Sequence, residues 1–122
     1  MNASKHAPTH RATTYTVYPT GYDEFTFTDK STWTLTIEER GEVGQDSWAV
    51  KKMGSVLNSS GEWEYEPSPS NREDDFLSRC RFPLDEALRL ATAAVDGVVW
   101  NGVTAAQADV EVKLRLARDR RG

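Results

Sequence analysis

The sequence predicts an α+β fold, in which an antiparallel β-meander of four or five strands is covered on one face by one or two α-helices. Short stretches in the first half of the chain alternate between apolar and polar residues. The links between these stretches have hairpin length, which requires antiparallel pairing, and a helical pattern follows in the second half. The length of 122 residues fits one domain with one core.

The clearest strand spans residues 31–39, where Trp33, Leu35 and Ile37 alternate with threonine and glutamate. One side of this strand is apolar and the other is polar, so we expect it to be half-buried. Gly41 and Gly44 bound the hairpin loop that follows. The other expected strands have weaker patterns and lie around residues 15–17, 25–27, 48–53 and 62–66.

The strand expected at residues 62–66 places three glutamates on one side and Trp63 and Tyr65 on the other. The two aromatic side chains either pack in the core beneath a helix or form an interface, and the sequence leaves both alternatives open. Residues 67–71 contain two prolines, which lack the backbone donor of a central strand. We therefore expect a stiff, solvated loop there.

Residues 76–82 are expected to be extended, with Cys80 on one face and Arg79 and Arg81 on the other. Pro83 then opens a helix over residues 84–95, because a proline at a helix start gives up a donor that would be unpaired anyway. Apolar residues recur at helical spacing along this segment, and Gly97 stops it. The expected core consists of Trp33, Leu35, Trp48, Trp63, Leu84, Leu88 and Ala91.

The segment 104–118 fits two structures. Its valines and leucines alternate with charged residues as in a strand, whereas Thr104 and Gln107 have the spacing of a capping box. The i,i+4 pair of Asp109 and Lys113 also favours a helix, as does that of Glu111 and Arg115. We prefer the helix and keep the strand as the alternative.

Charge is distributed unevenly along this chain, whose formal net charge is −4. Residues 1–37 carry three basic and three acidic side chains, residues 38–75 carry four and ten, and residues 76–122 carry eight and six. The acidic middle or the basic end could steer a partner towards one face. The expected organisation is a disordered segment 1–13, a single domain 14–118 and a flexible basic tail 119–122.

Little in the sequence points to catalysis or to a bound cofactor. The glycines are scattered and form no phosphate-binding loop. His6 and His10 lie in the segment expected to be disordered, where they cannot be held beside Cys80 as a base or as metal ligands. We therefore expect no enzymatic activity, no cofactor and no metal. The single cysteine, the lack of a secretory signal and the lack of a long apolar run predict a cytoplasmic protein without membrane contact.

One block of the sequence, GEWEYEPSPSNREDDFL at residues 61–77, is unusually distinctive. Together with Trp48 and the run RFPLDEALRLA at residues 81–91, it resembles a group of small, mostly uncharacterised proteins of actinobacterial phages and prophages. The resemblance covers residues 33–103. It implies a small accessory protein that acts by binding rather than by catalysis, in the cytoplasm of an infected or lysogenic bacterial host.

Two functional hypotheses follow from these patterns. In the first, an acidic, aromatic and proline-stiffened surface around residues 62–75 binds a host or phage protein. Its expected contact residues are Glu62, Trp63, Glu64, Tyr65, Glu66, Arg72, Asp74 and Asp75. In the second, the basic C-terminal segment binds nucleic acid through Lys113, Arg115, Arg118, Arg120 and Arg121. A homo-oligomer is left open.

Overall fold

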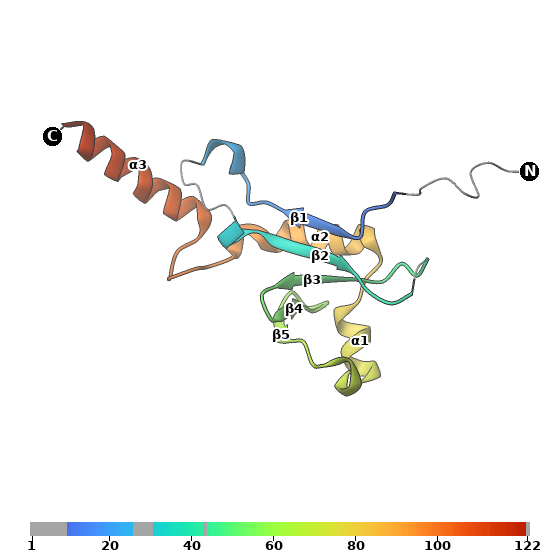
Figure 1. The fold of residues 1–122 in the computed structure, drawn as a ribbon. Coiled ribbons are helices and arrows are strands. Elements are labelled where there is room, and N and C mark those ends of the chain that lie inside the picture. Colours follow the sequence, from blue (N-terminus) through green and yellow to red (C-terminus); the bar gives the residue numbers. More distant parts are fainter. Residues whose placement is uncertain (1–9, 26–30, 43, 122) are drawn as a thin grey trace, which may run out of the picture.

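The computed structural model describes residues 10–25, 31–42 and 44–121, and it has an α+β fold (Figure 1). Its sheet is an antiparallel meander in which each strand pairs with the next one along the chain. The five strands are β1 (Thr14–Val17), β2 (Leu35–Glu39), β3 (Trp48–Lys52), β4 (Ser55–Leu57) and β5 (Trp63–Tyr65). The three α-helices are α1 (Asp74–Cys80), α2 (Leu84–Ala94) and α3 (Ala105–Arg121).

The predicted α+β class and the predicted meander are therefore confirmed. Strand β2 begins four residues later than expected, because residues 31–33 form a 3₁₀ turn. Strand β4 was not predicted, since it has only three residues and follows directly after the turn at Met53 and Gly54. Phe25 lies outside the strands and Phe27 lies outside the described residues.

The prediction that residues 76–82 are extended was wrong, because α1 occupies most of this segment. Asp74 and Asp75 lie in the first turn of α1, where the helix dipole favours negative charge. Phe76 and Cys80, four residues apart, form the buried side of the helix, while Ser78 between them is exposed. A strand would have placed all three on one face.

Helices α2 and α1 pack against opposite faces of the sheet. Neighbouring residues of β3 show this division, because Val50 belongs to the main core with α2 whereas Ala49 packs with α1. The main core also contains Leu35, Ile37 and Trp48. The smaller apolar cluster under α1 consists of Ala49, Val56, Phe76 and Cys80.

Most of the expected core is buried, with two exceptions. Trp33, Leu35, Trp48 and Ala91 are buried, and Leu84 packs against them at the margin. Leu88 and Trp63 are 37% and 40% exposed. Helix α2 packs mainly against β2 and β3, whereas β5 lies at the edge of the sheet.

Helix α3 projects away from the sheet (Figure 1), and only its first turns are anchored. Ala105, Ala108 and Asp109 are buried there. The expected capping box forms, since Thr104 N donates to Gln107 Oε1 at 2.8 Å and Gln107 N donates to Thr104 Oγ1 at 3.3 Å. The structure therefore supports the helical alternative for this segment.

Candidate functional site

Strand β5 lies at one edge of the sheet, and its two sides differ in exposure. Trp63 and Tyr65 are 40% and 78% exposed, whereas the Glu64 and Glu66 side chains point towards the α1 side and are 24% and 9% exposed. The expected alternation is therefore present, but the glutamates are the more buried residues. Arginines on and beside α1 make this possible, because they supply partners for both carboxylates.

The backbone of β5 has one free edge. Asn58 N donates to Glu62 O at 2.8 Å, and Glu66 N donates to Gly54 O at 3.2 Å. The glutamates therefore direct their backbone groups towards β4. Since these groups alternate in direction along a strand, the backbone N–H and C=O of Trp63 and Tyr65 face outwards.

Glu64 is held by three hydrogen bonds from two side chains on the inner side of β5. Arg79 donates two hydrogen bonds to its carboxylate, from Nη2 to Oε1 at 2.7 Å and from Nε to Oε2 at 2.8 Å. Asn58 Nδ2 adds a third at 2.8 Å. The bonds from Arg79 and Asn58 lower the pKa of Glu64 to about 2. Glu64 therefore orders the link between β5 and α1.

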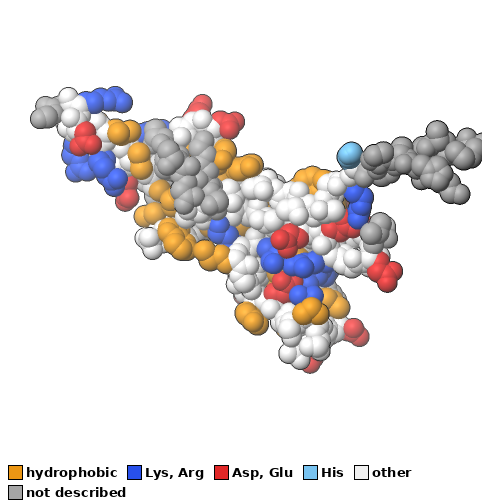
Figure 2. Space-filling model, viewed as in Figure 1, with side chains coloured by type: hydrophobic (Ala, Val, Ile, Leu, Met, Phe, Trp, Pro, Cys, Tyr) orange, Lys and Arg blue, Asp and Glu red, His pale blue; other side chains and the backbone are white. Residues whose placement is uncertain are grey.

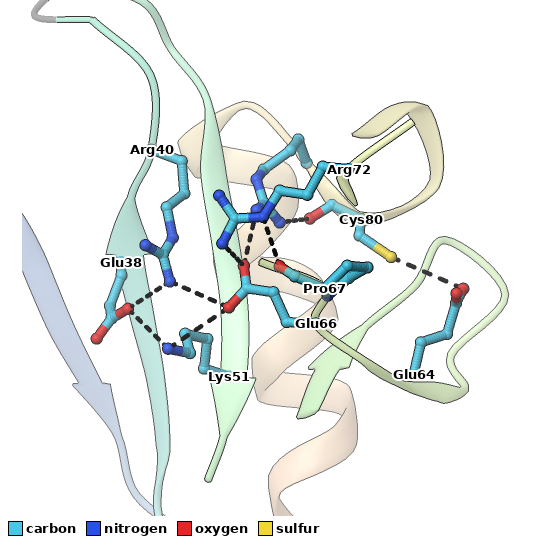
Figure 3. A network of polar contacts seen from close by, with 9 residues as sticks. Glu38, Arg40, Lys51, Glu64, Glu66, Pro67, Arg72 and Cys80 are labelled. Atoms are coloured by element: carbon cyan, nitrogen blue, oxygen red, sulfur yellow. Dashed lines mark hydrogen bonds and ion pairs between the residues drawn. The ribbon is translucent and has the colours of Figure 1, made fainter. Parts of the chain in front are cut away.

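Glu66 lies at the centre of a larger network (Figure 3). Arg81 Nη2 donates to Glu66 Oε1 at 2.7 Å, and Arg72 Nη2 lies 3.5 Å from the same oxygen. Arg40 Nη2 and Lys51 Nζ lie 3.3 and 3.7 Å from Glu66 Oε2. Burial opposes ionisation of Glu66, but the attraction of the cations outweighs it and lowers the pKa of this carboxyl.

The network extends from β5 across the sheet. Arg40 and Lys51 also contact Glu38 Oε2, at 3.0 and 3.4 Å. We call Glu38, Arg40, Lys51, Glu66, Arg72 and Arg81 the Glu66 cluster. Figure 2 shows basic and acidic side chains gathered together over the middle of the sheet. This cluster connects β2, β3, β5 and the segment around α1.

Cys80 lies beside Glu64 on the inner side of β5. Its Sγ is 3.7 Å from Glu64 Oε2, and its side chain is buried. Burial, followed by the Glu64 charge, raises the pKa of the Cys80 thiol to about 11. Such a thiol is protonated at neutral pH, which does not favour a nucleophile. Residues 10–25, 31–42 and 44–121 contain no group of three or more metal-ligating side chains that could hold an ion.

The structure brings together only some of the expected contact residues. Glu62, Asp74 and Asp75 are exposed, whereas Arg72 is half-buried and donates from Nε to the carbonyl oxygen of Pro67 at 3.0 Å. The partners of the two glutamates, which are Arg40, Lys51, Arg79 and Arg81, were not predicted from the sequence. No local pattern identifies these partners, because they come from separate segments that meet only in the folded sheet.

The residues of the nucleic-acid hypothesis all belong to α3. Lys113 is paired with Asp109 at 2.7 Å, whereas Arg115, Arg118 and Arg120 are exposed. The side chain of Arg121 is not described. The two groups of expected contact residues therefore lie on separate parts of the molecule, with one at the β5 edge and one on the projecting helix (Figure 1).

Comparison with protein-family models, with curated proteins and with solved structures found no match. None of the helices in the described part of the chain is both long and apolar enough to span a membrane. The fold and the geometry of β5 are therefore the basis for a functional assignment.

Proposed function

We propose that this chain is a non-enzymatic accessory protein, of the phage or prophage type that its sequence resembles, and that it binds another protein through the edge of β5. The observation that carries this proposal is the exposure of Trp63 and Tyr65 side by side on an edge strand. Tryptophan and tyrosine are the residue types most often responsible for binding energy at protein interfaces.

The free edge of β5 supports a particular way of binding. Outward-facing backbone groups can pair with an extended segment of a partner, which then adds a strand to the sheet. The aromatic side chains would supply specificity beside this ladder. Because Glu64 and Glu66 fix the inner side of β5 through ion pairs, the strand is already ordered before binding, which lowers the entropic cost.

Of the acidic contact residues in the first hypothesis, Glu62, Asp74 and Asp75 remain exposed and available to a partner. Glu64 and Glu66 are occupied within the chain, so their replacement would disturb the fold rather than test an interface. Glu62 precedes Trp63 in the chain, and Asp75 and Tyr65 line the same shallow pocket. These exposed acids favour a partner segment that carries basic residues. This partner is a host or phage protein.

The test compares a double variant of the aromatic pair, Trp63→Ala with Tyr65→Ala, with the wild type. A partner captured from an actinobacterial lysate is purified and titrated by calorimetry against both proteins. We expect the double variant to bind at least about 10-fold more weakly, since each anchor residue contributes more than about 1 kcal/mol.

Tyr18→Ala is the matched control, because Tyr18 is an aromatic residue that is 48% exposed at the opposite edge of the sheet. Its binding should stay within twofold of the wild type. Equal affinity of the wild type and the double variant would overturn the assignment of this edge.

A second candidate function is nucleic-acid binding by α3. It is favoured by the exposure of Arg115, Arg118 and Arg120 on a helix that projects from the body of the protein. A triple change of these arginines to glutamine should abolish a gel shift seen at low salt. The absence of any shift by the wild type at low salt would dismiss this candidate.

A further inference from the structure

Beside the Glu66 cluster lies a groove of about 630 Å³. Three arginines of the cluster, Arg40, Arg72 and Arg81, line it together with Glu39, and Gln45 and Ser47 are among its polar residues. The arginines come from the end of β2, from the loop before α1 and from the residue after α1. This groove is separate from the exposed aromatic pair on β5.

The charges of the Glu66 cluster, which borders this groove, do not balance among themselves. Arg40, Lys51, Arg72 and Arg81 provide four positive charges, whereas Glu38 and Glu66 provide two negative ones. Glu39 adds no net charge, because its Oε1 is paired with Arg11 Nη2 at 2.5 Å. Two positive charges are therefore left over, in a protein whose net charge is −4.

The guanidinium groups retain unused donors. Both contacts of Arg40 with carboxylates leave from Nη2, and its Nε is buried without a hydrogen-bond partner among the described residues. Arg72 and Arg81 each donate one hydrogen bond to a backbone carbonyl oxygen, and each contacts Glu66 through a single nitrogen. Close cations that are only partly neutralised repel one another, so an anion in the groove would relieve this repulsion.

We propose that the groove binds the free hydrogen phosphate dianion. Its double charge matches the two unbalanced positive charges, and guanidinium groups present their donors in the geometry of phosphate oxygens. Glu39 sets the selectivity, because a carboxylate accepts a hydrogen bond from the O–H of hydrogen phosphate. Glu39 Oε2 is buried without a hydrogen-bond partner among the described residues, and sulfate has no proton at neutral pH to donate to it.

The test is thermal unfolding of the whole chain in sodium phosphate, sodium sulfate and sodium chloride at one ionic strength. Sulfate is the essential control, because both oxyanions stabilise proteins generally by exclusion from the surface. We expect phosphate to raise Tm saturably, by about 5 °C more than sulfate at saturation. An equal effect of phosphate and sulfate would overturn the proposal.

Arg72→Gln should abolish this phosphate-specific rise, since Arg72 lines the groove and Arg81 continues to hold Glu66 in the variant. Arg79→Gln is the matched control: it removes the same charge nearby, from a side chain that does not line the groove. It should keep the phosphate-specific rise even if its starting Tm is lower. A rise that persists in Arg72→Gln would contradict the site.

A spectroscopic measurement on the wild type avoids dependence on any variant. The Nε–H signals of arginines in ¹⁵N-correlated spectra should shift saturably on titration with phosphate, and much less with sulfate. Glycerol phosphate in a parallel titration is a further control, because its dianion has the same charge but no P–O–H to donate to Glu39. Its response should be as weak as that of sulfate, and an equal response to both phosphates would contradict the role of Glu39. No saturable shift with phosphate would overturn the proposal.

Discussion

The two faces of the sheet are stabilised by different interactions. On the α2 face, Leu35, Ile37 and Val50 are fully buried within one continuous apolar core. On the α1 face, the apolar cluster is small, and charged side chains around Glu64 and Glu66 fill the rest of the contact. The same strands thus carry a dry face and an ionic face.

This difference determines what each face can do. Apolar burial is non-directional and involves no titratable group, so its contribution to stability is insensitive to pH. The ionic face depends on protonation and on the fixed geometry of its arginines, and it is the face that carries a groove with unbalanced charge. We therefore expect the α2 face to provide most of the stability, and the α1 face to respond to pH and to the phosphate proposed above.

The largest expected effect comes from the α2 face. Ile37→Ala should destabilise the protein by about 2–5 kcal/mol, because it removes a fully buried side chain and leaves a cavity. Urea unfolding at pH 7 measures this change as a lower midpoint. Val110→Ala on α3, where the side chain is 55% exposed, is the control and should change the free energy of unfolding by less than about 0.5 kcal/mol. Similar losses in both variants would contradict the location of the core.

A smaller effect, dependent on pH, is expected from the ionic face. The folded pKa of Glu64 is about 2, below its usual value of 4.5, because Arg79 and Asn58 bond to the charged form. The contribution of Glu64 is therefore complete above about pH 4.5 and is lost as the pH falls towards 2. Urea unfolding between pH 7 and pH 2 should show this loss, and Glu64→Gln should show a flatter pH profile.

Glu62→Gln is the control for this pH experiment. Glu62 is exposed and makes no ion pair with the described residues, so the steepness of the profile should not change. If Glu64→Gln lost stability between pH 4.5 and 2 as steeply as the wild type, the bonds from Arg79 would not be the source of the acid sensitivity.

The dry face could be predicted from the sequence better than the ionic face. Helix α2 has apolar residues at helical spacing, and β2 has a strict alternation, so each pattern identifies its own buried side. In β5 the alternation shows which residues share a side of the strand, but it does not show which side packs against the rest of the protein. That choice depends on Arg79 and Arg81, which lie 15 residues later in the chain.

Helix α1 was missed for a related reason. Phe76 and Cys80 share a side in either a strand or a helix. Only the exposure of residue 78 separates the two structures, because a strand would place it on the same side as Phe76 and Cys80. The Glu66 cluster was beyond prediction, because its cations come from three separate segments that meet only in the folded sheet. Local patterns specify elements, whereas this cluster depends on long-range packing.

The smallest expected effect is a matched pair of hydroxyl substitutions, one on each face. Val50→Thr places a hydroxyl in the apolar α2 core, which should cost about 1–3 kcal/mol. Cys80→Ser places one on the α1 face within reach of Glu64 Oε2, which accepts from Cys80 Sγ in the wild type. This serine can donate a hydrogen bond to the carboxylate, so the loss should be below about 1 kcal/mol. Urea unfolding at pH 7 gives both values, and a larger loss for Cys80→Ser would show that the ionic face tolerates a new polar group no better than the dry one.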